Sequence, residues 1–299
     1  MPLAIVASPE YDAPLPPGHR FPMGKFLALA EILEARGLCP AGFARPEPAS
    51  EAMLGLAHDG DYVRRVCETA LTPQEERRIG LPVTADVAKR ARAAVGGTLL
   101  AARLALQQGL ACNTAGGSHH AARSGGAGFC VFNDVAVASL ELLAKGEARR
   151  VLIIDLDVHQ GDGTALILAN EPRAYTFSMH CQANFPTIKP PSDRDIGLAR
   201  GMGDAQYLEV LEGALPEVFA AARPDLIFYN AGVDVHEADQ LGQLCLSDAG
   251  LAAREAMVLD FAMAQGVPLA SVLGGGYGPD AHAVALRHAI LPQLAAKRV

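Results

Sequence analysis

Residues Val151–Gly163, "VLIIDLDVHQGDG", indicate both the fold class and the position of a site. The stretch begins with the apolar run Val151–Ile154 and continues with three carboxylates and an imidazole within eight residues. A short, β-branched apolar run of this kind is typical of an interior strand in a parallel sheet. Carboxylates at the end of a buried strand are costly unless each is paired or bound to a cation. The stretch therefore predicts a buried strand that ends in a site.

The acidic residues of this stretch have two interpretations. As helix N-caps they would precede a helical pattern that starts at Thr164, and the position of Asp162 agrees with this role. Capping does not account for Asp155, Asp157 and His159 together. A carboxylate and an imidazole two positions apart can converge on one ion. We therefore favour a metal site.

The composition indicates a globular protein that does not bind nucleic acid. Half of the 299 residues are apolar, and 25 Lys and Arg against 33 Asp and Glu give a net charge of −8 without a dense basic cluster. No apolar run approaches a membrane span, and the apolar stretch near the N-terminus is too short for a signal peptide. Six scattered cysteines without a C-x-x-C pair are typical of reduced thiols. We expect one domain over residues 1–299, located in the cytoplasm.

Strand and helix patterns alternate along the chain. Strands are expected near residues 3–7, 110–114, 151–156, 174–179, 226–230 and 269–273. Helices are expected near residues 23–37, 60–70, 84–108, 133–145, 206–222, 248–265 and 280–297. The pair Gly96-Gly97 indicates close helix packing, and residues 181–204 read as a long irregular loop of the functional kind. The alternation predicts an α/β fold, with one open parallel sheet and helices on both faces.

Polar residues follow three further predicted strands. His119 and His120 stand in "AGGSHHAARSGGAGFC", Asp234 in "AGVDVHEADQLG" and Tyr277 in "GGGYG". Each segment alone has an ordinary explanation: surface histidines, a helix cap or a glycine turn. Because the carboxyl ends of parallel strands meet at one edge of the sheet, we expect these side chains to converge there. Structural roles are expected for the histidines away from these strand ends, His19, His58, His282 and His288.

The converging side chains would suit a metal ion and a base. Asp157, His159 and Asp234 provide two carboxylates and one imidazole, which suit a zinc-like ion with open positions for water and substrate. Two anionic ligands reduce the effective charge of such an ion, so a base must assist it. His119 and His120 would supply one general base and one electrostatic partner.

Three further residues complete this chemistry. Asp155 and Asp162 are available to orient the two histidine rings and to set their basicity. The hydroxyl of Tyr277 would donate a hydrogen bond to a developing oxyanion. The set predicts metal-assisted hydrolysis of an amide, which requires no Ser or Cys nucleophile.

Five motifs resemble those of the zinc-dependent histone deacetylase family. They stand here, in the order of the family, as "GGSHHA", "GFCVFND", "DLDVHQGDG", "AGVD" and "GGGY", and the similarity runs from about residue 19 to the end of the chain. The class IV branch is the most similar, because it has Gln where class I enzymes have a second His, and that residue here is Gln160. The resemblance implies an arginase/deacetylase-like fold with the active site at the C-terminal ends of the strands.

The resemblance also implies roles for individual residues. It matches the ligands of one zinc ion per chain to Asp157, His159 and Asp234. It matches the catalytic group to His119, His120, Asp155, Asp162 and Tyr277, with His120 as general base. It matches the walls of an acyl-lysine channel to Gly128, Phe129 and Phe185. It implies a potassium ion held around Asp155, Asp157, His159, Ser178 and Met179.

Two departures from the family pattern lie at the channel rim. The sequence "NFPT", residues 184–187, replaces the more usual F-P-G, and the acidic rim residue of class I enzymes is not identifiable in residues 77–83. We therefore do not expect a close match to a histone peptide.

Three functions agree with these motifs. The favoured one is removal of acetyl or longer acyl groups from lysine side chains of a protein or peptide. An acetylpolyamine hydrolase, or another small-molecule amide hydrolase, would use the same catalytic residues. A catalytically silent acyl-lysine binding module is disfavoured because the chain keeps every metal ligand and the tyrosine. The sequence leaves the oligomeric state open.

Overall fold

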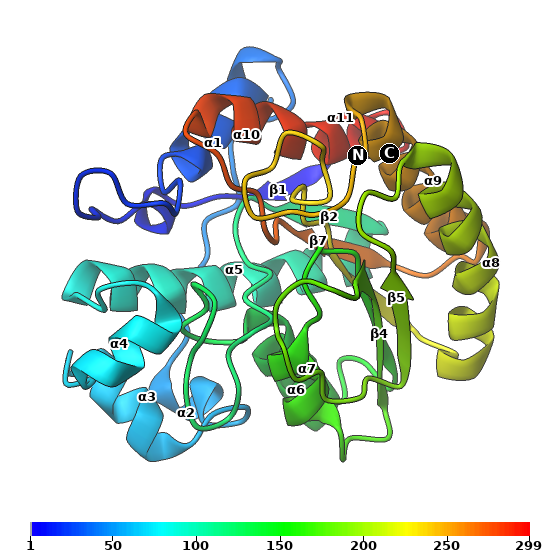
Figure 1. Cartoon of the computed structure of the whole chain (residues 1–299). Coiled ribbons are helices and arrows are strands. Elements are labelled where there is room, and N and C mark those ends of the chain that lie inside the picture. Colours follow the sequence, from blue (N-terminus) through cyan, green and yellow to red (C-terminus); the bar gives the residue numbers. More distant parts are fainter. Residues whose placement is uncertain (1) are drawn as a thin grey trace.

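Seven strands of the described chain form one open sheet in which every neighbouring pair is parallel (Figure 1). The computed structural model describes residues 2–299. The strands are β1 (Ala4–Val6), β2 (Leu110–Asn113), β3 (Val151–Asp155), β4 (Ala174–Cys181), β5 (Arg194–Leu198), β6 (Leu226–Asn230) and β7 (Leu269–Val272). Their order across the sheet is β1-β2-β7-β6-β3-β4-β5. The predicted open parallel sheet is confirmed.

Helices cover both faces of this sheet. In Figure 1, α5, α6 and α7 lie below the sheet, and α1 and α8 to α11 lie above it or to its right. The long helices are α1 (Lys25–Ala35), α5 (Ala85–Gln108), α6 (Asp134–Lys145), α8 (Asp204–Ala222) and α9 (Asp248–Ala264). The short ones are η1 (Pro9–Tyr11), α2 (Glu51–Leu54), α3 (Gly60–Cys67), α4 (Pro73–Ile79), α7 (Asp162–Leu168), α10 (Ala281–His288) and α11 (Ile290–Ala296). The chain is thus a single α/β domain, as predicted.

No helix among residues 2–299 has both the length and the apolar character that crossing a membrane requires.

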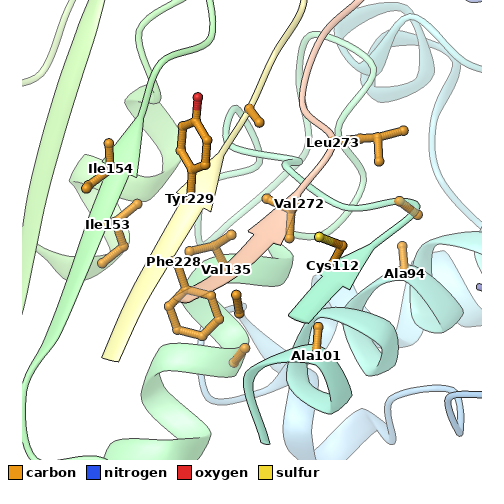
Figure 2. Close-up of a cluster of buried hydrophobic side chains, with 14 of the residues drawn as sticks. Ala94, Ala101, Cys112, Val135, Ile153, Ile154, Phe228, Tyr229, Val272 and Leu273 are labelled. Atoms are coloured by element: carbon orange, nitrogen blue, oxygen red, sulfur yellow. The ribbon is translucent and has the colours of Figure 1, made fainter. Parts of the chain in front are cut away.

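The central strands are buried on both sides. Every residue of β3 and β6 is buried, which is why these strands read as continuous apolar runs. Figure 2 shows Phe228 and Tyr229 of β6 on opposite faces of the sheet, beside Ile153 and Ile154 of β3. Full burial of a side chain of this size contributes about 1.5–3 kcal/mol. This packing fixes the carboxyl ends of the two strands relative to each other.

The direction of the chain reverses between β3 and β6. From β3 the chain proceeds outward to β4, and from β6 it proceeds outward to β7 on the other side. The helices that follow the two strands, α7 and α9, lie on opposite faces (Figure 1). Loops that part in this way leave a crevice at the strand ends, where ligands of open α/β sheets bind.

One expectation about the chain between β4 and α8 is wrong in part. Within residues 181–204, expected as irregular, the strand β5 pairs with β4 from Phe177↔Arg194 to Cys181↔Leu198. An edge strand has one neighbour and stays largely exposed, so "RDIGL" carries no apolar run to predict it. Backbone pairing with β4 forms the strand instead.

Two helical regions also differ from the expectation. The region 280–297 forms two helices, since Pro292 has no N–H to donate to the carbonyl of His288. Helix α4 was not predicted, because "PQEERRI" has no apolar periodicity. A capping box between Thr72 and Glu75 starts this helix.

The glycine pair in α5 makes close contacts, as predicted. A Cβ atom on Gly96 would overlap the carbonyl oxygen of Glu47, and one on Gly97 would overlap the hydroxyl of Tyr11. The two glycines therefore let the N-terminal segment pack directly on α5.

We expect Gly96→Ala to lower the free energy of unfolding by about 1–3 kcal/mol, because the added methyl group displaces backbone. Gly213→Ala is the matched control, since Gly213 is an exposed residue of α8 with no atom near its Cβ position. It should raise stability by about 0.5–1 kcal/mol. Denaturant unfolding of both variants checks the prediction, and equal effects would contradict it.

Candidate active site

The three predicted metal ligands lie together across the crevice between β3 and β6. Asp157 and His159 follow β3, and Asp234 follows β6. One ligand atom from each lies within 4.8 Å of the others, and all three side chains are buried. The Nδ1 atom of His159 is 3.0 Å from Oδ1 of Asp157 and 3.1 Å from Oδ2 of Asp234. The reversal of the chain therefore brings together residues that lie far apart in the sequence.

The chemistry of these donors fits a divalent cation. Burial, and next to it the charge of Asp157, raises the pKa of the Asp234 carboxyl. Asp157 accepts two backbone N–H groups, from Gly275 to Oδ2 at 2.6 Å and from His159 to Oδ1 at 3.0 Å, and Asp234 accepts one, from Val158 to Oδ1 at 2.9 Å. His119 Nε2 lies 3.7 Å from Oδ1 of Asp157 as a further partner, yet burial still raises the pKa of Asp234, so a cation between the two carboxylates would stabilise them. The group can hold a metal ion with two oxygen ligands and one nitrogen ligand.

The tandem histidines stand beside this group and face each other. The Nδ1 of His119 is 2.7 Å from Oδ2 of Asp155, and the Nδ1 of His120 is 2.6 Å from Oδ1 of Asp162. Each Nδ1–H donates to its carboxylate, so each Nε2 points into the site. The two Nε2 atoms are 3.1 Å apart. At this distance one Nε2 carries a proton and the other accepts it.

The surroundings of the pair determine which ring holds that proton. Burial lowers the pKa of His119, but Asp155 and then Asp157 outweigh burial and raise it to about 9. Burial, followed by the charge of His119, lowers the pKa of His120 to about 4. His119 is therefore the protonated ring, and His120 keeps a free lone pair on Nε2.

Asp134 holds the loop that carries the histidine pair, a role that the sequence did not reveal. Its Oδ2 accepts hydrogen bonds from Thr98 Oγ1 at 2.6 Å and Gly117 N at 3.0 Å, and its Oδ1 accepts from Ser118 N at 2.7 Å. The residue lies in the motif "GFCVFND" that carries the family resemblance. Its position in the first turn of a helix suggests only a role at the helix N-terminus, so the motif was the one available signal.

Asn230 is a second positioning residue that the sequence analysis missed. It is the last residue of β6, and its Nδ2 donates to Oδ1 of Asp155 at 2.9 Å. This bond orients the carboxylate of Asp155, which in turn orients the ring of His119. The available signal was a polar residue at the end of the apolar run "LIFYN".

Two polar residues, the half-buried Asp239 and the buried Lys25, hold the turn of Tyr277. The backbone N–H of Tyr277 donates to Oδ2 of Asp239 at 2.6 Å, and Oδ1 of Asp239 accepts from Leu241 N at 2.8 Å. On the other side, Lys25 Nζ donates to the carbonyl of Gly276 at 3.2 Å and lies 5.6 Å from the centre of the tyrosine ring. Neither residue was predicted. Both act by fixing the backbone that presents Tyr277.

A cavity of about 440 Å³ opens above the metal group and the histidines. Its walls include the three predicted channel residues Gly128, Phe129 and Phe185. The ring centre of Phe185 is 4.8 Å from that of His120, and the ring centre of Phe129 is 5.7 Å from that of Tyr277. Gly128 has φ +54°, and a Cβ atom there would meet the ring of His120. Glycine is therefore required where this wall turns toward the histidine.

The remaining sequence predictions are placed as follows. Ser178 pairs in register with Asp155, but its hydroxyl contacts His180 Nδ1 at 2.9 Å, and the potassium ion stays a prediction. His58 is buried in a structural role, because its Nδ1 lies 2.9 Å from the carbonyl of Ala122. His236, which the sequence analysis left out of the site, contacts Asp248.

Comparisons with known proteins agree with this arrangement. A family model described as the histone deacetylase domain matches residues 19–291. An uncharacterized protein of Picosynechococcus sp. is 48% identical over 97% of each chain. Histone deacetylase 2 of Arabidopsis thaliana is 30% identical over 92% of this chain and 74% of its own length. The crystal structure of an HDA15 HD domain superposes with a TM-score of 0.79 and 22% identity, over 98% of this chain and 88% of that one, and this likeness concerns the fold.

The family model covers nearly the whole sheet and every side chain of the site described above, from the histidine pair to Tyr277. The chain belongs to the histone deacetylase family of amide hydrolases.

Proposed function

We propose that this protein is a zinc-dependent deacylase that removes acetyl or longer acyl groups from lysine side chains. One observation supports this proposal most directly. The buried group of Asp157, His159 and Asp234 lies next to a hydrogen-bonded histidine pair at the base of a cavity with phenylalanine walls. Metal ligands, a base and a cavity with apolar walls are the parts that hydrolysis of an acylated alkyl amine requires.

The walls would bind and orient the substrate. Phe129 and Phe185 present aromatic faces to the methylene chain of an acyl-lysine, and Gly128 leaves room beside His120. An extended side chain entering between the rings would direct its amide toward the histidine pair and Tyr277. Burial of the methylene groups contributes about 0.8 kcal/mol each.

The side chains at the base would perform the proton transfers. A bound zinc ion would supply Lewis-acid polarisation of the amide carbonyl. The free Nε2 of His120 accepts a proton from the attacking water, while the protonated ring of His119 stabilises the negative charge that develops. The proton then passes to the leaving nitrogen as the C–N bond breaks, which yields a carboxylate and a free amine.

Tyr277 stabilises the oxyanion in this proposal. Its side chain lines the cavity, and within residues 2–299 its hydroxyl has no hydrogen-bond partner. Burial, with Asp157 and Asp234 next, raises the pKa of this phenol well above its ordinary value, so the hydroxyl keeps its proton and can donate it in a hydrogen bond.

The activity itself is tested with one substrate series. Lysine peptides acylated from acetyl to myristoyl, together with acetylated polyamines, are incubated with the zinc-loaded protein, and the released amine is measured. We expect turnover of at least one acyl-lysine peptide. Turnover of the acetylated polyamines alone would indicate a polyamine hydrolase in place of a lysine deacylase. Binding of the acyl-lysine peptides without turnover would indicate an acyl-lysine binding module.

Removal of a metal ligand should abolish both zinc binding and activity. We expect Asp157→Ala and His159→Ala to lose stoichiometric zinc, because two remaining ligands hold the ion weakly. His282→Ala, an exposed histidine of α10, is the control and should keep its zinc. Elemental analysis after dialysis checks the metal, and circular dichroism checks the fold. Full zinc content in both ligand variants would refute the assignment.

The two histidines should differ in their effect on kcat. Because His120 holds the free lone pair, His120→Ala should be the more damaging change, by about 10²–10⁴-fold in kcat at unchanged zinc occupancy. His119→Ala removes charge stabilisation and should cost less. Single-turnover rates of both zinc-loaded variants check this order. A much larger loss of kcat in His119→Ala would make His119 the general base and His120 its electrostatic partner.

Tyr277→Phe separates the oxyanion role from simple packing, because the two rings have almost the same volume. We expect kcat to fall about 10²–10³-fold, as for loss of one oxyanion donor, while KM changes much less. Zinc content and melting temperature should stay at the wild-type values. If the variant retained most of its kcat, the tyrosine would be a packing residue.

A further inference from the structure

Three arginines surround the mouth of the cavity, and no carboxylate lines it. Arg20, Arg77 and Arg78, here called the arginine rim, all contribute to its lining and are exposed. The other polar lining residues outside the catalytic group are neutral, namely Asn184, Gln240 and Gln243. The chain as a whole carries a net charge of −8. The mouth is therefore positive on a protein that is negative overall.

The guanidinium groups of the rim have no acidic or hydrogen-bonding partner within residues 2–299. None of them forms an ion pair or a side-chain hydrogen bond there, although acidic residues are in surplus in this chain. The exposed Arg64 on neighbouring α3, by contrast, pairs with both Asp61 and Glu68. The acidic residue next to the rim, Glu76, accepts a hydrogen bond from Val83 N at 2.7 Å instead. The rim thus presents unneutralised positive charge to whatever enters.

Hydrogen bonds to backbone carbonyls hold the segments of the rim together. His19, next to Arg20, lies with Nε2 3.0 Å from the carbonyl oxygen of Gly80, just after α4. The carbonyl of Arg78 accepts from Gly128 N at 3.3 Å, which joins α4 to the channel wall. The guanidinium carbon of Arg20 lies 5.1 Å from the ring centre of Phe129. Three segments far apart in the sequence thus place the rim directly over this wall.

The dipole of α4 explains the positions of only two of the three arginines. Arg77 and Arg78 stand in the last turn of α4, where basic side chains favour the helix dipole. Arg20 lies in no helix and gains nothing from that dipole. Its contact with the ring of Phe129 instead places its charge over the same wall.

We propose that the arginine rim selects acyl-lysine segments flanked by aspartate and glutamate, and this inference rests on the deacylase function proposed above. Carboxylates beside the acyl-lysine would meet the rim while the acylated side chain enters between the phenylalanine rings. Lysine-rich peptides and polyamines carry the wrong charge, and their approach to the rim is unfavourable. The attraction acts outside the catalytic group, so it changes KM and the association rate rather than kcat.

The test uses three peptides with the same acyl-lysine and with acidic, neutral or basic flanking residues. For the full-length, zinc-loaded protein we expect kcat/KM to be about 10-fold higher for the acidic than for the basic peptide, since three exposed ion pairs each contribute a small factor. The preference should shrink between about 0.05 M and 0.5 M salt, because exposed charges are screened. The combined variant Arg20→Gln, Arg77→Gln and Arg78→Gln should lose the preference and keep its kcat on the neutral peptide.

A matched control removes three positive charges elsewhere. Arg36→Gln, Lys145→Gln and Arg149→Gln change the net charge equally, and none of these residues lines the cavity. This variant should keep the preference and its salt dependence. A preference that survives in the rim variant, or disappears equally in the control, would overturn the role of the rim. Faster turnover of acetylated spermidine than of the acidic peptide would overturn it too.

Binding of the same peptides distinguishes failure of the rim from failure of the deacylase function. Fluorescence anisotropy reports peptide affinity whether or not the amide is cleaved. The acidic peptide could bind more tightly to the wild type than to the rim variant while no peptide is hydrolysed. That result would support the charge selection by the rim and refute the deacylase function. Hydrolysis of all three peptides at equal kcat/KM would refute the charge selection by the rim and support the deacylase function.

Discussion

Four carboxylates at the carboxyl edge of the sheet are the constraint on which the rest of the site depends. Burial opposes their charge, so each needs a partner. His119 and Asn230 serve Asp155, and His120 serves Asp162. Asp157 and Asp234 share the imidazole of His159 and accept backbone N–H groups, two at Asp157 and one at Asp234, and burial still raises the pKa of Asp234. A divalent cation between these two carboxylates would stabilise them, and the same arrangement gives the two histidines different basicities.

Support for this site comes from polar residues that are themselves outside the reaction. Asp134 holds the loop of the histidine pair through backbone amides, and Asp239 and Lys25 hold the turn of Tyr277 from two sides. Each of these groups is bonded to main chain, so the catalytic side chains are fixed by backbone position. Such pre-organisation is what hydrogen bonding to a developing charge requires.

The base and the mouth of the cavity serve different purposes. The base contains the residues of the motifs shared with the histone deacetylase family, and these fit one type of chemistry. The mouth is built from Arg20, α4 and the loops after β4 and β6, and Phe129 of the motif "GFCVFND" forms a wall of it together with Phe185. Differences in substrate between members of one family are expected at such a rim, because the reaction does not constrain it.

Local patterns were enough to predict the strands β1 to β4, β6 and β7, since buried apolar runs and helical periodicity are properties of short segments. The same patterns located the metal group and the histidine pair, because parallel strands always bring their carboxyl ends to one edge. They failed at β5 and α4, which are polar elements held by backbone pairing and capping. They also failed at Asn230 and Asp239, whose partners lie far away in the sequence. The arginine rim arises only where three distant segments meet, and no local pattern contains that contact.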